Sequence, residues 1–272
     1  MDSYPFADRA AEDKRLIAQG TLFDPLTRRL LQQAGIAPGM RVLDLGSGAG
    51  NVARIAAELA GPTGAVVGIE KDPAAVKLAQ RRTDLDGGAA SIEFRVGDVQ
   101  TLEGVEDGFD AAVGRLVLLY MADPVAALRR AATRLRPGGL ICLHEADLGY
   151  PPAEPQTPLW GQTHSWFLEA LEKAGIEPSM GRSLYAAFRA AGLPGPRLRV
   201  ETFAGGGTDS PGWAWANVIS AAVPLMERLG VATRDEVDPP TLADRLLTEA
   251  IASDSCVYGP PMTGAWATVP AV

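Results

Sequence analysis

The stretch Arg41–Ala57, RVLDLGSGAGNVARIAA, constrains the fold more than any other part of this 272-residue chain. It begins with residues that are apolar on both faces, as expected for a central parallel strand covered by helices on each side. After Asn51 the apolar residues, among them Val52 and Ile55, recur at the spacing of one helix face. The glycines of Gly46–Gly50 lie between the two elements, where they allow a sharp turn and let a ligand approach the main chain closely. The stretch therefore predicts a strand, a ligand-binding turn and a helix.

The glycine pattern distinguishes between two classes of nucleotide-binding turn. A dinucleotide fingerprint of the form G-x-G-x-x-G would need its third glycine where this chain has Asn51. The pattern is instead acid-x-Gly-x-Gly-x-Gly, with Asp44 as the acid. It resembles motif I of the class I S-adenosylmethionine (SAM) methyltransferases. The resemblance implies SAM as cofactor and places Asp44, Gly46, Ser47 and Gly48 among the residues that bind it.

Two acids downstream occupy the positions at which this family binds the nucleoside. Glu70 ends the strand predicted over 65–70, where an acid can accept hydrogen bonds from both ribose hydroxyls. The resemblance implies that Lys71 packs near the adenine, and that Asp98 and the main-chain N–H of Val99 contact its amino group and ring. The alternatives are a solvated strand-end acid for Glu70 and an Asx turn for Asp98.

Gly114 and Arg115 end the fourth predicted strand. DNA methyltransferases and some protein methyltransferases carry [DN]PP[YF] here, and its absence disfavours those classes. The resemblance implies that the backbone of 114–116 contacts the cofactor. The guanidinium of Arg115 could bind a carboxylate of SAM or of the substrate, or could belong to a surface ion pair.

The alternation of strands and helices predicts the fold class. From Arg41 to Glu145 the connections are short, which is typical of an α/β protein with a doubly wound parallel sheet. The resemblance implies a Rossmann-like sheet of seven strands, the last two forming an antiparallel hairpin. Strands are expected over 41–45, 65–70, 92–96, 109–114, 140–145, 197–203 and 262–269.

Two parts of the chain are expected. Residues 1–145 would hold N-terminal helices and the SAM-binding core, and 146–272 the remaining strands with helical cap insertions, about 146–181 and 209–253, for substrate binding. The N-terminal part predicts a helix over about 9–19 and a second that begins with Asp24 as N-cap and Pro25 at its first position. The motif Arg136–Gly139 is expected to end the helix before the fifth strand.

The two histidines are the candidates for a general base, since imidazole is suited to proton removal near neutral pH. His144 lies near the end of the fifth strand, and His164 lies in the first cap helix. His144 and Glu145 are adjacent in a strand and should face opposite sides. The alternative for either histidine is a packed side chain. A metal site is not expected, because the Asp/Asp/Asn pattern of metal-dependent catechol methyltransferases is not recognisable.

Aromatic residues concentrate in the proposed cap and favour an apolar or ring-containing substrate, although core packing is the alternative for each. The candidate substrate-binding residues are Tyr120, Trp160, His164 and Trp213. Candidates in the N-terminal segment for closing over the cofactor are Tyr4, Arg15 and Gln19.

Composition narrows the partners and the compartment. The net charge of −8 and the pI near 4.9 argue against a nucleic-acid partner. Two cysteines are too few for a disulfide framework and favour a reducing cytoplasm. No secretory signal or membrane-spanning segment is expected. Richness in Ala, Gly, Pro and Arg indicates a bacterial source, and a homo-oligomer is left open.

The motifs VLDLGSGAG, VGIEKDP, GDVQ and LRPGG are most similar to the branch of ubiquinone/menaquinone C-methyltransferases and bacterial small-molecule methyltransferases. This resemblance implies O-, N- or C-methylation of a small metabolite, as in natural product biosynthesis. The alternative is a SAM-binding protein of the same fold that catalyses a cyclisation or rearrangement without methyl transfer. A nicotinamide oxidoreductase and a non-catalytic interaction module are less favoured.

Overall fold

The computed structural model describes residues 9–86 and 91–270, without the side chains of 9–19, 21, 85 and 86. The chain divides into two compact units. The sheet unit comprises Leu16–Glu145, Met180–Val200 and Thr263–Val272. The helical unit comprises Met1–Arg15, Ala146–Ser179 and Glu201–Met262.

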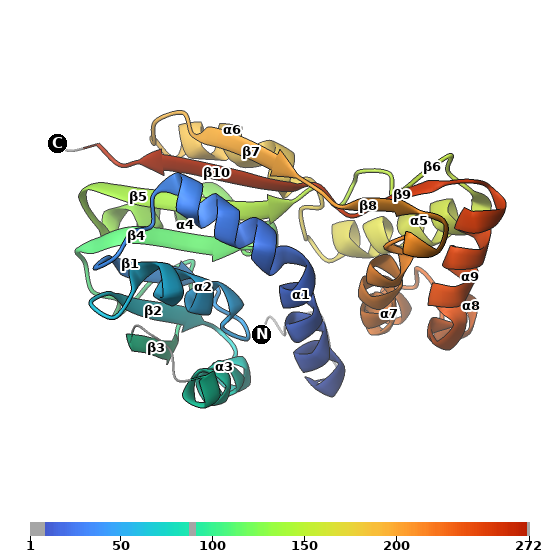
Figure 1. Ribbon diagram of the computed structural model, residues 1–272, viewed down its shortest axis with the longest axis horizontal. Helices are drawn as coiled ribbons and strands as arrows, with labels where there is room; N and C mark the ends of the chain where they lie inside the picture. The colour runs from blue at the N-terminus through green and yellow to red at the C-terminus, as the bar shows by residue number, and fades with distance from the viewer. Residues whose placement is uncertain (1–8, 87–90, 271–272) are drawn as a thin grey trace. The chain divides into compact units, whose positions relative to one another are not determined.

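The sheet unit is built on a seven-stranded sheet of order β3-β2-β1-β4-β5-β10-β7. β1 pairs in parallel with β2 and β4, which in turn pair in parallel with β3 and β5. β10 runs against its neighbours β5 and β7 (Figure 1). The strands are β1 Arg41–Leu45, β2 Ala65–Glu70, β3 Ser91–Val96, β4 Phe109–Arg115, β5 Leu135–Ala146, β7 Arg197–Glu201 and β10 Met262–Thr268. The predicted class I methyltransferase fold is confirmed, including the antiparallel pair at the edge.

Helices cover both faces of this sheet (Figure 1). They are α1 Arg9–Ala34, α2 Asn51–Ala60, α3 Pro73–Asp86, α4 Pro124–Thr133 and α6 Met180–Ala190, with a short 3-10 helix η1 Leu118–Tyr120. One continuous core joins α1 and α2 to the sheet, and Leu30, Ile55, Val113 and Trp266 are buried in it. Gly264 of β10 lets α1 approach closely, because a Cβ there would clash with Leu30.

The N-terminal helices differ from the prediction. Residues Arg9–Ala34 form a single helix with Pro25 inside it, so Asp24 is not an N-cap. Proline in a helix interior loses one backbone hydrogen bond. The helix nevertheless continues, because it buries Leu30 and Leu31 in the core, and because Asp24 forms an ion pair with Arg115.

The fifth strand begins earlier than predicted. The helix α4 ends at Thr133, and β5 already begins at Leu135, so the motif Arg136–Gly139 belongs to the strand. Phe109 of β4 pairs with Leu135, whereas Ala111 pairs with Leu140. This register shift is a bulge that accommodates the Pro-Gly-Gly segment within the ladder.

The helical unit buries large side chains, among them Trp160, Phe167 and Trp215. Its helices are α5 Pro158–Lys173, α7 Gly212–Arg228, α8 Arg234–Val237 and α9 Pro239–Ala252, with η2 Gly207–Asp209. A small antiparallel sheet of order β6-β9-β8 consists of β6 Ala153–Glu154, β8 Ala204–Gly206 and β9 Cys256–Tyr258. Glu249 of α9 caps α5, because its carboxylate accepts from Thr157 Oγ1 at 2.6 Å and Leu159 N at 3.1 Å. The predicted insertions contain α5, α7, α8 and α9, and their role as a substrate cap stays a prediction.

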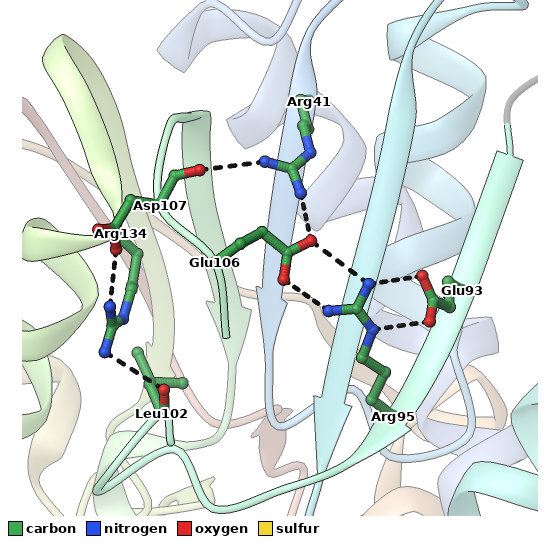
Figure 2. A network of polar contacts seen from close by, with 7 residues as sticks. All are labelled: Arg41, Glu93, Arg95, Leu102, Glu106, Asp107 and Arg134. Carbon is green, nitrogen blue, oxygen red and sulfur yellow. Dashed lines mark hydrogen bonds and ion pairs between the residues drawn. The ribbon is translucent and has the colours of Figure 1, made fainter. Parts of the chain in front are cut away.

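An ion-pair network ties the edge strand β3 to the centre of the sheet (Figure 2). Arg95 of β3 donates two hydrogen bonds of 2.7 Å to Glu93 and one of 2.6 Å to Glu106. Glu106 precedes β4 and also pairs with Arg41 of β1. These hydrogen bonds, that from Arg95 first, hold the pKa of Glu106 below its usual range.

Glu106→Gln is expected to lower the melting temperature by roughly 2–4 °C at pH 7 and low salt, since exposed ion pairs contribute up to about 1 kcal/mol. Because the folded-state pKa of Glu106 is lowered, its contribution is present above the unfolded pKa and is lost as the pH falls through the folded pKa. The difference between the two proteins should therefore shrink as the pH is lowered below about 4, which thermal unfolding at several pH values would measure. Glu103→Gln, in the same loop, is the control. An equal effect of both substitutions would contradict the role of the network.

Candidate functional site

The glycine turn between β1 and α2 is fixed by its backbone conformation and by hydrogen bonds from Arg82. Gly46, Gly48 and Gly50 have φ values of 65°, 51° and 81°, in the left-handed region that favours glycine. Arg82 of α3 donates to the carbonyl of Ala49 at 2.6 Å and to Asn51 Oδ1 at 2.8 Å. These bonds give Asn51 a structural role at the position where a dinucleotide fingerprint has its third glycine.

Glu70 joins the end of β2 to the glycine turn. Its Oε2 accepts from Gly48 N at 2.9 Å, and its Oε1 accepts from Asp72 N at 3.0 Å. Both bonds orient the carboxylate, and each oxygen keeps a lone pair that could accept a ligand hydroxyl.

The predicted adenine-binding residues lie beside Glu70. Asp98 Oδ1 accepts from Gln100 N at 2.7 Å, which is the Asx turn considered above, and its Oδ2 lies 3.7 Å from Lys71 Nζ. Val99 is buried. The sheet unit thus brings Lys71, Asp98 and Val99 together at the carboxyl ends of β2 and β3, and their contacts with a cofactor stay a prediction.

Asp44 and Ser47 present buried polar atoms to the turn. Within the part of the chain that the structure describes, both carboxylate oxygens of Asp44 and the hydroxyl of Ser47 are buried without a hydrogen-bond partner. Burial raises the pKa of Asp44 to about 8, although the positive charge of Arg115 and the nearby backbone N–H of Ala53, which lies outside strict hydrogen-bond geometry, oppose the shift. Unpaired buried acceptors are costly. A bound group that carries positive charge and N–H donors, such as the ammonium group of an amino acid, fits this position.

Arg115 forms its ion pair within the chain. Its Nη1 donates to Asp24 Oδ1 and to Thr27 Oγ1, both at 2.9 Å, so α1 supplies the carboxylate that the sequence left open. Gly114, just before it, packs against Val117 and Leu143. The guanidinium is therefore a link between β4 and α1, whatever it contacts in a bound ligand.

His144 extends this link to β5. Thr27 Oγ1 donates to the carbonyl of Phe23 at 2.9 Å and lies 3.1 Å from His144 Nδ1. The one hydroxyl proton of Thr27 is used in the bond to Phe23, so Thr27 Oγ1 can only accept from its other two neighbours. Arg115 donates one of these hydrogen bonds, and His144 must donate the other. Nδ1 of His144 therefore carries the proton, and Nε2 carries the lone pair. Burial, and secondarily the charge of Arg115, lowers the pKa of His144 to about 3. The imidazole is therefore neutral at physiological pH.

Glu145 faces the opposite side of the sheet from His144, as the strand alternation predicts. Its Oε1 accepts from Val117 N at 2.9 Å and from Leu118 N at 2.8 Å. The carboxyl group is fully buried, which raises its pKa to about 7, while the backbone N–H groups of Leu118, Val117 and Leu119 oppose the shift.

The remaining predicted site residues have varied surroundings. His164 Nε2 donates to the carbonyl of Leu148 at 2.8 Å, and its ring meets the edge of Trp215 at a centroid distance of 5.3 Å. Trp160 is fully buried and donates to the carbonyl of Leu246 at 3.1 Å, contacts typical of core packing. Trp213 is 44% exposed, and Tyr120 ends η1. Substrate contacts by these four residues stay predictions.

Three further expectations concern metals, membranes and the N-terminus. Among the described residues no group of three or more His, Cys, Asp and Glu side chains could hold a metal ion. No described helix has the length and apolar character needed to cross a membrane. Tyr4 and the side chains of Arg15 and Gln19 lie outside the described residues.

Sequence reasoning missed several residues of the site. Asp24 was predicted as a helix cap, and Arg82 lies in a helix without any motif. Thr27 carries no sequence signal, because its role depends on α1 crossing the ends of β4 and β5. Glu145 could have been found from strand alternation, which places it on the face opposite His144.

Comparisons with known proteins agree with the fold. The family model for a methyltransferase domain matches residues 36–179. The aklanonic acid methyltransferase DauC of Streptomyces sp. is 35% identical over 119 residues, covering 44% of this chain and 54% of DauC. The ubiquinone/menaquinone biosynthesis C-methyltransferase UbiE of Ectopseudomonas mendocina is 30% identical over 136 residues, covering 50% of this chain and 53% of UbiE. The chain thus spans about half the length of these curated relatives.

A solved structure extends the match to nearly the whole chain. A putative methyltransferase from Bacillus halodurans aligns with a TM-score of 0.58 and 15% identity, covering 90% of this chain and 98% of that one. At that identity the match bears on the fold alone. Together with the family model and the glycine turn, it means that the chain belongs to the methyltransferase domain family, with the class I fold.

Proposed function

We propose that this protein is a SAM-dependent methyltransferase that acts on a small, apolar or ring-containing metabolite, at an oxygen, nitrogen or carbon atom. The observation that carries the proposal is the glycine turn, with Glu70 bonded to Gly48 on one side and the buried, unpaired Asp44 on the other. Its membership of the methyltransferase domain family supports the reaction class.

The residues at the turn fit the parts of SAM. Glu70 would accept from the ribose hydroxyls, and Asp98 with the N–H of Val99 would contact the adenine, next to Lys71. Asp44 and Ser47 would receive the ammonium group of the methionine part, which supplies the donors that their buried oxygens lack.

The other cofactor contacts come from backbone and from one guanidinium. The backbone of Gly46, Gly48 and Gly114 would border the cofactor, since glycine permits close approach. Arg115 is held by Asp24 through Nη1, and its other N–H groups could reach a carboxylate.

Bound SAM supplies an electrophilic methyl group on a sulfonium centre. The chain has to align the acceptor, exclude water and, for a hydroxyl or an acidic carbon, remove a proton. Good alignment alone contributes on the order of 7–11 kcal/mol at best. The transfer therefore depends on positioning more than on any single base.

The partners and compartment are part of the proposal. We infer a small-molecule substrate, no nucleic-acid partner and a cytoplasmic location. The net charge of −8 supports the second inference, and the two free cysteines, of which Cys142 is buried, support the third.

Calorimetric titration with S-adenosylhomocysteine, SAM and NADH tests the cofactor. Micromolar binding of the first two and none of NADH is expected. Glu70→Ala should weaken S-adenosylhomocysteine binding by about ten- to a hundredfold, because a carboxylate that accepts two ligand hydroxyls is lost. Glu103→Ala, an exposed acid, is the control. Binding of NADH alone would overturn the cofactor assignment. If the protein binds SAM but methylates none of a panel of apolar hydroxyl and amine acceptors, the non-methylating alternative is favoured.

The two histidines can be tested as bases with variants that keep their hydrogen bonds. His164→Gln keeps a donor for Leu148, and His144→Asn keeps a donor for Thr27, while each removes the ring nitrogen that could take a proton. Burial lowers the pKa of both histidines, and for His164 the hydrogen bond to Leu148 opposes the shift, whereas the charge of Arg115 adds to it and brings the pKa of His144 to about 3. His164 is therefore the better candidate, and His164→Gln should reduce kcat about a hundredfold or more. His144→Asn should change kcat little. The reverse order would assign the base to His144, and unchanged rates in both would mean that neither histidine is the base.

Asp44→Asn should raise stability and weaken cofactor binding. The folded-state pKa of Asp44 is raised to about 8. At a pH between the unfolded pKa and about 8, the folded chain therefore keeps a proton on Asp44 that the unfolded chain has released. Stability of the wild type therefore falls as the pH rises through this range. The variant lacks this dependence, so its advantage in melting temperature should grow from pH 5 to pH 8. A variant less stable than the wild type at pH 8 would contradict this account.

A further inference from the structure

The turn after β4 is held in an unusual conformation next to the glycine turn. Leu116 has a φ of 54°, in the left-handed region that residues with a Cβ rarely adopt. Such conformations persist only where neighbouring contacts enforce them, and they cluster at functional sites. The contacts that enforce the conformation of Leu116 come from β5.

Three consecutive backbone N–H groups of this turn bond to β5. Leu116 N donates to the carbonyl of His144 at 3.0 Å. Val117 N and Leu118 N both donate to Oε1 of Glu145, at 2.9 and 2.8 Å. Glu145 is fully buried, and within the described chain its Oε2 has no partner. One carboxylate oxygen therefore fixes two neighbouring residues of the turn.

The side chain of Val117 carries this constraint to the glycine turn. A Cβ built on Gly46 would lie 2.7 Å from Val117 Cγ2, and one on Gly114 would lie 3.0 Å from Val117 Cγ1. Val117 therefore packs directly against the first glycine of the turn and against the end of β4. Contact is continuous from Glu145 through Val117 to Gly46.

A buried carboxyl group is a costly way to satisfy two N–H groups, because one of its oxygens remains unpaired. An apolar side chain at this position would leave the N–H groups of Val117 and Leu118 without their acceptor, so the turn depends on the carboxyl group. Glu145 bonds to Val117, the residue that contacts Gly46, so the carboxyl group can fix that contact.

We propose that Glu145 is a positioning residue: it holds Val117 against Gly46, so that the glycine turn keeps its cofactor-binding geometry before the cofactor arrives. The inference rests on the proposed function for its role in binding. Its structural part, the coupling from Glu145 to the glycine turn, exists in the ligand-free protein and can be tested there.

The first experiment is amide hydrogen exchange of the ligand-free protein. Glu145→Ala should speed exchange at Val117 and Leu118 and across Gly46–Gly50. Val117→Ala should speed exchange across Gly46–Gly50 only, because the carboxylate still holds the turn. Glu145→Gln should resemble the wild type, since its amide oxygen can accept both N–H bonds.

Val269→Ala is the matched control. Val269 is also buried in the sheet unit, but its N–H bonds to Gly139, at the other end of β5. It should leave exchange across Gly46–Gly50 unchanged even where its melting temperature falls as far as that of Val117→Ala.

The second experiment measures S-adenosylhomocysteine affinity of the same variants. Glu145→Ala and Val117→Ala should weaken binding about tenfold, the size of effect expected from coupling through packed residues. Glu145→Gln and Val269→Ala should stay close to the wild type. Rescue by glutamine separates the hydrogen-bonding role from a general loss of packing.

Unchanged exchange across Gly46–Gly50 in either Glu145→Ala or Val117→Ala would overturn the proposal. If Glu145→Ala does not fold, Val117→Ala and Glu145→Gln still decide it. A wild type that binds no S-adenosylhomocysteine would refute the proposed function instead, while the exchange experiment would still decide the coupling.

Discussion

The parallel pairing of β1 with both β2 and β4 is the constraint on which the site depends. Leu45 lies opposite Ile69 on one side and Gly114 on the other, so the three strands end at the same level. The residues that follow them, including Gly46, Glu70 and Arg115, are therefore neighbours although they are far apart in the chain. A ligand at this edge meets groups from all three strands at once.

This edge of the sheet also collects buried charge. Asp44, Arg115 and His144 point to the face covered by α1, where Thr27 links Arg115 to His144. Glu145 points to the other face. Each buried polar group costs stability unless it is paired. Among the described residues, the buried polar atoms without a partner include those of Asp44 and Ser47 at the glycine turn, where a bound ligand could restore the lost hydrogen bonds.

The parts that were predictable have a local origin. The turn Gly46–Gly50 follows from glycine spacing, and the sheet follows from alternating apolar segments. The ion pair of Asp24 was not predictable, because the local signal Asp24-Pro25 indicated a helix start and tertiary contacts to Arg115 overrode it. The start of β5 was not predictable either, because the Pro-Gly-Gly segment usually ends a secondary-structure element. Here a bulge in the pairing with β4 accommodates it within the strand.

The sequence alone determined the fold class and the cofactor turn, because both depend on residue types at fixed spacing. Only the tertiary structure decided which buried groups meet. The tautomer of His144 depends on Thr27 from a distant helix, and the bonds of Glu145 depend on a turn that precedes it by a whole helix and strand. Hydrogen-bond partners and burial depend on how the elements pack against one another. The spacing of residues along one segment does not determine that packing.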